Sequence, residues 1–376
     1  MESGLNPASN LGRLIPAAFP APDTGAGTGA NGSNGTHGLN GEASHPLLNG
    51  GLQTPAMAAR LRELDARILA QASLFDADVV AYLEYVLRCH GKRLRPTLAL
   101  LCGEATGGIT DAHLDLGTII EMIHLATLVH DDIMDGASQR RNQPTASSRW
   151  GAEISVLVGD CLFAHALRIC SSKFPQEVSG VISGAMSEVC TGEILQTQRR
   201  FDLNLTFEDY IRIVRMKTGE LFRIACHLAA SINGASPETV AALGRYGESL
   251  GIAYQIYDDC LDFLGNEEEA GKTLGTDMEK GKITLPFLYL LQALKGDPAA
   301  HEAVCEALLH GSPADRRALV AQVKGRGALV RTLGTLSEYL ASCRDALDFL
   351  PPSEAQESLA AIPIVLSGHV AELTGQ

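Results

Sequence analysis

From Ala56 onward, apolar residues recur at spacings of three and four, the pattern of α-helices that bury one face. Leu61, Leu64 and Ile68 begin this pattern, and Gly, Pro, Asp or Asn stand at the breaks between its segments. We expect further helices at residues 96–106, 111–135, 153–173, 176–198, 207–232, 237–264, 283–294, 298–309, 313–325, 327–349 and 353–373. Alternating strand patterns and fixed-period repeats are absent from the sequence, so it predicts a single all-α domain over residues 56–376.

Residues 1–55 differ from the rest in composition. They contain "GAGTGANGSNGTHGLNGEASHPLLNGG", rich in Gly, Asn, Ser and Thr and without apolar periodicity. Such a segment buries too little apolar surface to offset the conformational entropy lost on ordering. We therefore expect a disordered leader here, for which the sequence indicates no function.

Composition argues against several classes of protein. The 376 residues include 44 acidic and 30 basic side chains, a formal charge of −14 that repels phosphate backbones, so no nucleic-acid partner is expected. The nine cysteines are scattered without a CxxC pair, which is typical of reduced thiols in a cytoplasmic protein. Because there is no continuous run of 18 apolar residues and no secretory signal, we expect neither a transmembrane segment nor export.

Three aspartates interrupt an apolar segment in "LVHDDIMDGASQRR", residues 128–141. Helical positions four apart point to nearly the same side, so Asp131 and Asp135 can present carboxylates to one spot, with Asp132 about 100° around the helix. Two such carboxylates raise each other's pKa unless a cation lies between them. One motif of this kind is also typical of a solvated helix face.

The same spacing returns in "GIAYQIYDDCLDFLG" as Asp258, Asp259 and Asp262. Because carboxylates in apolar surroundings are costly unless paired, we expect both helices to direct them into one shared cavity. Mg²⁺ fits such a site, since it prefers oxygen ligands and usually shares them between carboxylates, waters and substrate phosphates. Zn²⁺ fits less well because neither motif supplies a set of His and Cys ligands. The ligand type predicts a phosphorylated substrate.

Basic residues lie beside both motifs. Each group alone is typical of a solvated surface, but their joint placement in an acidic protein favours phosphate binding. The groups are Arg140 and Arg141 after the first motif, Lys92, Arg93 and Arg95 in "HGKRLRP", and Lys272, Lys280 and Lys282 in "GKTLGTDMEKGKITLP".

From about residue 60 to the carboxyl end, the chain resembles trans-isoprenyl diphosphate synthases of the polyprenyl synthetase family. The resemblance rests on motifs that occur in order: "GKRLRP", "EMIHLATLVHDDIMD", "RRNQPT", "SVLVGD", "GEILQ", "KTGELF", "YQIYDDCLDF" and "GKITLP". It implies an all-α bundle around a deep central pocket, a homodimer, and about three Mg²⁺ ions that bind an allylic diphosphate through both acidic motifs. The implied reaction condenses isopentenyl diphosphate with an allylic prenyl diphosphate.

The resemblance also assigns roles to individual positions. Catalytic, metal-binding positions correspond to Asp131, Asp132, Asp135, Asp258, Asp259 and Asp262. Positions that bind isopentenyl diphosphate correspond to Lys92, Arg95, His124 and Arg141. Positions near the allylic diphosphate correspond to Arg140, Lys217, Thr218, Gln255, Lys272 and Lys282. A lone helical histidine is often structural, so both interpretations of His124 stay open, whereas His130 and the cysteines are interpreted as packing residues.

The implied chemistry needs no protein nucleophile. Metal ions and cationic side chains stabilise the departing pyrophosphate, and the resulting allylic cation is attacked by the double bond of isopentenyl diphosphate. In this family, a bulky residue four or five positions before the first aspartate limits product length, and here those positions hold Thr127 and Ala126. We therefore expect a medium or long linear product, such as a quinone side-chain precursor, and expect Ala126→Phe to shorten it. Ile123 is a further candidate for the floor of this pocket, and a geranylgeranyl or farnesyl product is the alternative.

Some positions depart from the family pattern. Asn142 replaces the usual Gly after the arginine pair, and Gln143 replaces a basic residue, which is expected to weaken binding of isopentenyl diphosphate. Gly136 directly follows the first motif, where it can end the helix or loosen the loop.

Three rival functions remain open. A class I terpene cyclase also uses an aspartate-rich helix, but it typically has an Asn/Ser/Glu triad instead of the second motif. A non-catalytic subunit of a heteromeric synthase commonly lacks aspartates from one motif, whereas both motifs are complete here. A metal-dependent phosphohydrolase using His130 and Asp131 needs further histidines at helical spacing, and none stands out.

Overall fold

The computed structural model describes residues 54–88, 91, 93–141, 143–264 and 276–374. The chain divides into two units, Met1–Gly41 and Glu42–Gln376, and every described residue belongs to the second. Apart from its last two residues, the expected leader lies outside the described residues, and the expected domain boundary stays a prediction.

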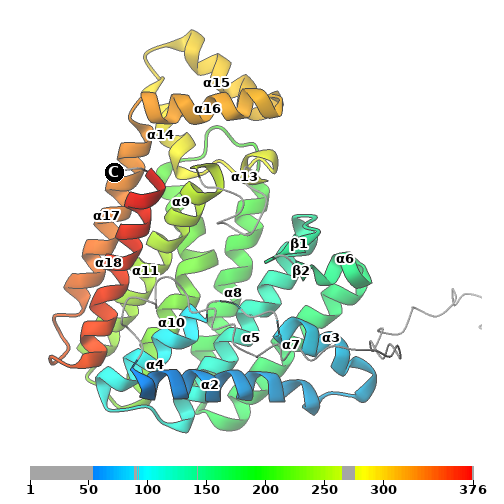
Figure 1. Ribbon diagram of the computed structural model, residues 1–376, viewed down its shortest axis with the longest axis vertical. Helices are drawn as coiled ribbons and strands as arrows, with labels where there is room; N and C mark the ends of the chain where they lie inside the picture. Colours follow the sequence, from blue (N-terminus) through cyan, green and yellow to red (C-terminus); the bar gives the residue numbers. More distant parts are fainter. Residues whose placement is uncertain (1–53, 89–90, 92, 142, 265–275, 375–376) are drawn as a thin grey trace, which may run out of the picture. The chain divides into compact units, whose positions relative to one another are not determined.

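The described residues are almost entirely helical, as the apolar periodicity predicts (Figure 1). The elements are α2 (Pro55–Ala70), the 3₁₀ helix η1 (Gln71–Leu74), α3 (Ala77–Leu87), α4 (Leu94–Thr106), α5 (Asp111–Met134), β1 (Gln139–Arg140), β2 (Gln143–Pro144), α6 (Ala146–Trp150), α7 (Ala152–Lys173), α8 (Gln176–Gln198), α9 (Phe207–Val214), the π-helix η2 (Arg215–Gly219), α10 (Glu220–Ile232), α11 (Pro237–Leu264), α13 (Thr276–Glu279), α14 (Leu285–Ala293), α15 (Pro298–His310), α16 (Pro313–Gly325), α17 (Ala328–Ala346) and α18 (Glu354–Thr374).

Helix α5 lies in the interior of the bundle because apolar residues cover all of its sides. Leu116, Ile119, Ile120 and Met122 are completely buried. The helix packs against α2, α4, α7 and α10 (Figure 1). Its interior position means that any carboxylate near its end lies where apolar helices converge.

The end of α5 is set by Gly136. Asp135 is the C-cap, and Gly136 adopts the left-handed conformation with φ of 61°. The amide of Gly136 donates to the carbonyl of Ile133 at 3.1 Å. The amide of Ala137 donates to the backbone carbonyl of Asp132 at 2.9 Å. This pair of bonds is a Schellman motif, which a glycine adopts without steric cost. The first acidic motif therefore occupies the last turn and C-cap of α5.

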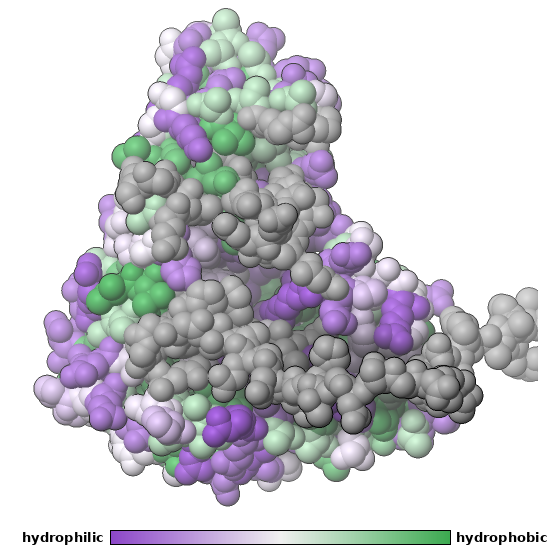
Figure 2. Space-filling model, viewed as in Figure 1, coloured by the Kyte–Doolittle hydropathy of each residue, from purple (hydrophilic) through white to green (hydrophobic). Residues whose placement is uncertain are grey.

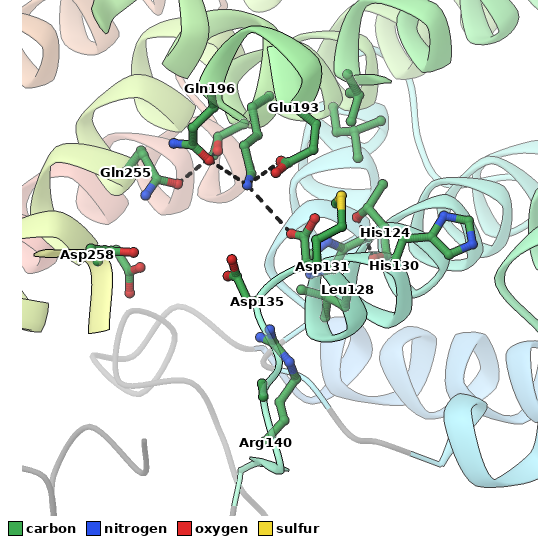
Figure 3. A pocket seen from close by; sticks show the side chains of 18 of the residues that line it. His124, Leu128, His130, Asp131, Asp135, Arg140, Glu193, Gln196, Gln255 and Asp258 are labelled. Carbon is green, nitrogen blue, oxygen red and sulfur yellow. Dashed lines mark hydrogen bonds and ion pairs between the residues drawn. The ribbon is translucent and has the colours of Figure 1, made fainter. Parts of the chain in front are cut away.

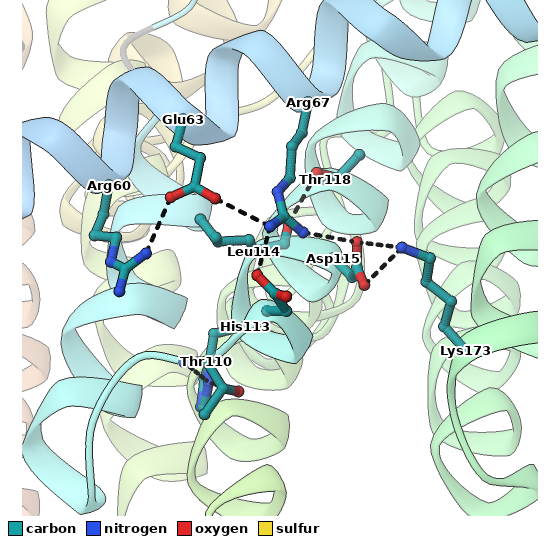
Figure 4. A network of polar contacts seen from close by, with 10 residues as sticks. Arg60, Glu63, Arg67, Thr110, His113, Leu114, Asp115, Thr118 and Lys173 are labelled. Carbon is teal, nitrogen blue, oxygen red and sulfur yellow. Dashed lines mark hydrogen bonds and ion pairs between the residues drawn. The ribbon is translucent and has the colours of Figure 1, made fainter.

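Ion pairs connect three helices at the other end of α5 (Figure 4). Arg67 of α2 contacts Glu63 at 3.0 Å and Asp115 of α5 at 3.3 Å. Lys173 of α7 contacts the same Asp115 at 2.8 Å. Each partly exposed pair contributes about 0.2–1 kcal/mol, so the network fixes helix positions more than it adds stability.

The predicted helix 207–232 is interrupted. The structure has α9 and α10 separated by η2, a single π-helical turn at Arg215–Gly219. A π turn inserts one extra residue per turn and is found frequently at functional sites. Apolar spacing alone does not reveal it, because the pattern on either side remains helical.

Helices α10 and α11 pack together, and α17 and α18 cover α11 on one side of the bundle in Figure 1. The buried hydroxyl of Tyr246 in α11 donates to the carbonyl of Leu359 in α18 at 2.8 Å. The C-terminal helices thus fix the position of α11, which carries the second acidic motif.

One short strand pair was not predicted. Strands β1 and β2 pair antiparallel, with Gln139 opposite Pro144 and Arg140 opposite Gln143. Two-residue strands are too short to show an alternating pattern, so the sequence gives no signal for them. They form a hairpin directly after the first acidic motif.

Two helices, α5 and α7, are long and apolar enough to cross a membrane by length and composition. The apolar window of α5 is 72% buried inside the protein, as in core helices of folded domains, and that of α7 is 44% buried. We expected no transmembrane segment because the sequence has no continuous run of 18 apolar residues. These two helices pass a less strict criterion, the mean hydropathy of an 18-residue window. Hydrophilic and hydrophobic residues are interspersed on the face shown in Figure 2. Eight described cysteines are free thiols.

Candidate active site

One cavity of about 1630 Å³ lies between helices α4, α5, α8, α10 and α11 and the π-helix η2. Apolar side chains form part of its wall, including those of Leu128, Val189 and Phe222. Charged side chains from both acidic motifs and from several basic segments line the same cavity. The structure thus brings the two motifs together at one cavity, although Asp131 and Asp258 are 127 positions apart in the sequence.

The first acidic motif divides its carboxylates between the cavity and the protein interior. Asp131 and Asp135 line the cavity, whereas Asp132 is only 5% exposed and lies outside its wall. Asp132 accepts a hydrogen bond from Nε of Arg140 at 2.8 Å. Burial raises the pKa of Asp132 although Arg140 opposes this, and burial likewise raises the pKa of Asp131.

The second motif faces the first across the cavity. Figure 3 shows Asp258 on the opposite side from Asp131 and Asp135. Asp259 also lines the cavity but is only 5% exposed. Asp262 does not line it: this carboxylate is 3% exposed and accepts from the amide of Asp277 at 3.2 Å. This bond connects Asp262 of α11 to the backbone of the turn at Asp277, and the catalytic role expected for Asp262 stays a prediction.

Both oxygens of Asp259 accept hydrogen bonds from the protein. The hydroxyl of Tyr210 donates at 2.6 Å, and the side-chain amide of Gln255 donates at 2.8 Å. Burial and the nearby charge of Asp277 raise the pKa of Asp259 to about 7. Gln255 in turn accepts from the hydroxyl of Thr218 at 2.8 Å. This chain of four side chains connects α9, α11 and η2.

Sequence reasoning missed Tyr210. Its only signal is an aromatic residue in the buried face of α9, and nothing local distinguishes it from a packing residue. The contact with Asp259 depends on how α9 and α11 pack, which the sequence spacing does not give.

Lys217 and Thr218 both line the cavity because they lie in the π-helix η2. The ammonium of Lys217 pairs with Glu193 of α8, donates to Gln196 at 2.9 Å, and lies 3.7 Å from Asp131. Figure 3 labels the three partners of this amine, Glu193, Gln196 and Asp131. Glu193 and Gln196 were not predicted as site residues, although "GEILQ", one of the motifs of the resemblance, contains both.

Three cations surround Asp135. Lys282 lies 3.2 Å and Lys280 3.4 Å from one carboxylate oxygen, and Arg200 lies 3.2 Å from the other. Burial alone would raise the pKa of Asp135, but Lys282 and Lys280 lower it below its ordinary value. Lys282 also contacts Asp277 at 3.1 Å, and these carboxylates raise its pKa despite burial. Arg200 was not predicted as a site residue, because a pair of arginines in a linker is usually exposed to solvent.

A second basic region of the cavity contains Arg95, His124 and Arg141. Arg95 stacks over the ring of Phe222 at 4.6 Å, and its Nε is buried without a hydrogen-bond partner in the described residues. Burial lowers the pKa of Arg95 to about 10. Burial and the charges of Arg95 and Arg141 hold the pKa of His124 well below its usual value, so the imidazole is neutral. A buried donor without a partner costs about 1–3 kcal/mol, and more when it is charged, and an anionic ligand would offset this cost.

Arg93, one of the basic residues beside the cavity, has a structural role. Its backbone is left-handed, with φ of 45°, at the N-cap of α4. The guanidinium is 8% exposed and contacts Glu121 at 2.6 Å and Asp65 at 2.9 Å. Lys92 and Lys272, predicted for the two diphosphate sites, lie outside the described residues, as does Asn142.

The three residues expected to limit chain length differ in their position relative to the cavity, and their role stays a prediction. Thr127 lines the cavity, whereas Ala126 and Ile123 do not and are completely buried in the core. Successive residues of a helix are about 100° apart, so Ala126 faces neighbouring helices when Thr127 faces the cavity. The side chains of Leu128 and Val189 also line the wall, and the sequence spacing did not identify them.

The acidic residues fit a metal ion that is bound by protein and substrate together better than an ion whose ligands all come from the protein. Among the described residues, no group of three His, Cys, Asp or Glu side chains is arranged to hold a metal. The cavity nevertheless offers oxygen ligands from Asp131, Asp135 and Asp258. Mg²⁺ typically takes one or two carboxylates and completes its coordination with water and substrate phosphates, so this donor set fits it.

The fold and cavity define a class of all-α enzymes that enclose a deep, charged site within a helical bundle. The sequence model of the family "Polyprenyl synthetase" matches residues 77–323. The chain belongs to the Polyprenyl synthetase family.

Individual relatives agree with this assignment. The octaprenyl diphosphate synthase of Escherichia coli is 34% identical over 79% of this chain and 91% of that protein. The heptaprenyl diphosphate synthase component 2 of Bacillus subtilis is 32% identical over 74% of this chain and 79% of that protein. A crystal structure of polyprenyl synthase from Caulobacter crescentus, complexed with calcium and isoprenyl diphosphate, superposes with a TM-score of 0.78, at 32% identity, over 86% of this chain and 97% of that one.

Proposed function

We propose that this chain is a trans-prenyltransferase that condenses isopentenyl diphosphate with an allylic prenyl diphosphate to give a linear polyprenyl diphosphate. One observation carries this proposal: carboxylates of two distant motifs and two basic regions line a single cavity that also has an apolar wall. Diphosphates need cations, whereas prenyl chains need apolar surface. The cavity supplies both.

The cavity has room for two substrates. Its volume of about 1630 Å³ exceeds the roughly 300–1,000 Å³ of typical small-molecule sites. We assign isopentenyl diphosphate to the region of Arg95, His124 and Arg141. We assign the allylic diphosphate to the region of Arg140, Lys217, Thr218, Gln255 and Lys282.

Asp131, Asp135 and Asp258 would hold Mg²⁺ together with the allylic diphosphate, because these three carboxylates of the two acidic motifs line the cavity. When bound, Mg²⁺ would neutralise the negative charge that develops on the leaving pyrophosphate. Asp259 would have a supporting role, since Tyr210 and Gln255 occupy both of its oxygens. Asp132 would position Arg140.

The side chains of the protein then account for the reaction. Lys217, Lys282 and Arg140 bind and orient the diphosphate, and the electron pair of the breaking carbon–oxygen bond leaves with pyrophosphate. The double bond of isopentenyl diphosphate attacks the allylic carbon and a carbon–carbon bond forms. The neighbouring carbon loses a proton to the released pyrophosphate. Leu128, Val189 and Phe222 exclude water, which would otherwise capture the cation.

We propose a medium or long product. The relatives named above make heptaprenyl and octaprenyl diphosphates by their names. The small side chain of Thr127 at the cavity wall supports this, because it leaves space where a large ring would stop the chain. A geranylgeranyl or farnesyl product remains the alternative.

We further propose a homodimer in the cytoplasm. Helix α7 exposes the apolar side chain of Leu157, which is 59% exposed and lies outside the cavity wall, and a second copy would cover it. Free thiols in the eight described cysteines are in keeping with a reducing compartment. The word "component" in the name of the Bacillus relative favours, as an alternative, a second, different polypeptide.

The test is elongation by the purified full chain. Incubation with Mg²⁺, farnesyl diphosphate and isopentenyl diphosphate should release pyrophosphate and give longer linear prenyl diphosphates. Chromatography of the dephosphorylated product measures its length. Asp131→Asn is the matched inactive control, because it keeps the shape of the side chain and removes its charge.

Three outcomes would contradict the proposal. A cyclic hydrocarbon would favour a terpene cyclase. Turnover only after addition of another polypeptide would favour a subunit of a heteromeric synthase. Phosphate release without any new carbon–carbon bond would favour a phosphohydrolase.

A further inference from the structure

The linker between α8 and α9 contains a strained aromatic residue. Phe201 has φ of 61°, in the left-handed region that residues other than glycine rarely occupy. Such a conformation costs about 1–2 kcal/mol and persists only when its surroundings impose it. Phe201 is also 44% exposed, so burial of the ring does not explain the strain.

Phe201 is held by Gly281. Its amide donates to the carbonyl of Gly281 at 2.7 Å. Gly281 is also left-handed, with φ of 74°, and a Cβ there would lie 2.5 Å from a carbon of the Phe201 ring. The ring therefore rests directly on the backbone of residue 281, a contact that only glycine allows.

Gly281 lies between Lys280 and Lys282, the two lysines that face Asp135. The amide of Lys282 donates to the carbonyl of Asp277 at 2.8 Å, which closes the turn 277–282. The amide of Asp277 donates to the carboxylate of Asp262 at 3.2 Å. The turn is thus attached to α11 at one end and to Phe201 at the other.

The residue before Phe201 contacts the same aspartate from the other side. Nη2 of Arg200 donates to Oδ1 of Asp135 at 3.2 Å, while Lys280 and Lys282 lie near Oδ2. Arg200 is not part of the cavity wall. Arg200 therefore fixes the orientation of the Asp135 carboxylate from outside the cavity wall, so that Oδ2 points toward Lys280 and Lys282.

We propose that Arg200 and Phe201 form a positioning latch: Arg200 fixes the carboxylate of Asp135, and Phe201 fixes the turn that carries Lys280 and Lys282. The latch sets the spacing between the first acidic motif and the lysines opposite it. Under the proposed function, on which this inference rests, that spacing decides how the site receives Mg²⁺ and the allylic diphosphate. Neither residue contacts substrate.

Kinetics of two variants test the latch. Loss of groups that orient metal-binding carboxylates typically costs about 10–100-fold in metal affinity. We expect Phe201→Ala and Arg200→Gln each to raise the half-saturating Mg²⁺ concentration or the KM for the allylic diphosphate by about tenfold or more, with a smaller change in kcat. Phe201→Tyr and Arg200→Lys should restore most of this loss.

Arg199→Gln is the matched control. Arg199 is the neighbouring arginine in the same linker, but it contacts Asp202 at 2.7 Å instead of Asp135. This variant should keep wild-type half-saturation values. An equal effect of Arg199→Gln and Arg200→Gln, or values within twofold of wild type in both latch variants, would overturn the proposal.

A second measurement does not depend on activity. Amide hydrogen exchange over residues 277–284 should become at least tenfold faster in Phe201→Ala, while exchange in α14 stays unchanged. Unchanged exchange in the turn would overturn the latch even if the enzyme elongates prenyl chains. Faster exchange in a chain that shows no elongation would retain the latch and reject the proposed function.

Discussion

Replacing Tyr210 by Phe removes one hydroxyl from the buried hydrogen-bond chain that holds Asp259. That hydroxyl donates to Asp259 at 2.6 Å, and both residues are 5% exposed. A hydrogen bond to a charged acceptor contributes about 1.5–3 kcal/mol, and the remaining carboxylate oxygen would stay buried without this donor. We therefore expect the free energy of unfolding to fall by about 2 kcal/mol, or roughly 3–5 °C in Tm.

The same change should alter kinetics, because Asp259 also anchors Gln255. A displaced Gln255 amide would raise the KM for the allylic diphosphate several-fold. The matched control is Tyr246→Phe: this tyrosine is also buried, but it donates to the neutral carbonyl of Leu359 away from the cavity. It should cost about 1 kcal/mol and leave KM unchanged.

Stability against pH gives a further readout of Tyr210→Phe. The pKa of Asp259 is raised to about 7 in the folded protein, above its value of about 3.9 in unfolded chains, so folding favours the protonated form. Without divalent metal, its contribution to stability should be largest below pH about 4 and decline as pH rises to about 7. The Tyr210 hydrogen bond lowers this pKa, so the variant should extend the decline to higher pH. Equal Tm losses in both tyrosine variants, with unchanged KM and pH profile, would refute the role assigned to Tyr210.

Three further predictions concern the cavity wall, the π-helix and a buried histidine. Thr127→Phe should shorten the product, whose length chromatography measures, because Thr127 lines the cavity. Ala126→Phe should instead destabilise the core by about 1–3 kcal/mol, because Ala126 is completely buried. An unchanged product length in Thr127→Phe would show that this part of the wall does not limit chain length. Lys217→Gln should lower kcat about 10²–10³-fold, because it removes the cation between Glu193 and Asp131, and a loss under threefold in initial rates would contradict this. Burial and Arg168 lower the pKa of His165 to about 4, so its contribution to stability is present above pH about 6.5 and lost as pH falls toward 4. His165→Gln should flatten the Tm profile over that range, and an unaltered slope would contradict the assignment.

The sequence predicted the helices because their signal is local. The apolar spacing of α5 and α11 identifies both helices and places the acidic motifs near their ends. The all-α fold, the family and the cavity shared by both motifs follow from those local patterns together with their order along the chain. Thr127 and Ala126 differ only by rotation about α5, which depends on the packing of neighbouring helices.

Several site residues depend on contacts between distant segments and could not be predicted. Tyr210 contacts Asp259 across 49 positions, and Arg200 contacts Asp135 across 65. Arg93 has the same chemistry as Arg95, but its left-handed backbone turns it toward Glu121. No local spacing encodes these contacts, because helix packing creates them.

The central claim is that the two acidic motifs act on one diphosphate in one cavity. The most direct test is a double-mutant cycle with Asp135→Asn and Asp258→Asn, in which calorimetry measures binding of an unreactive thio-analogue of the allylic diphosphate with Mg²⁺. Groups that share a ligand couple by about 0.5–3 kcal/mol, so the double variant should lose clearly less affinity than the two single losses combined. Losses that add within about 0.3–0.5 kcal/mol would mean that the motifs bind separately, and would contradict the account.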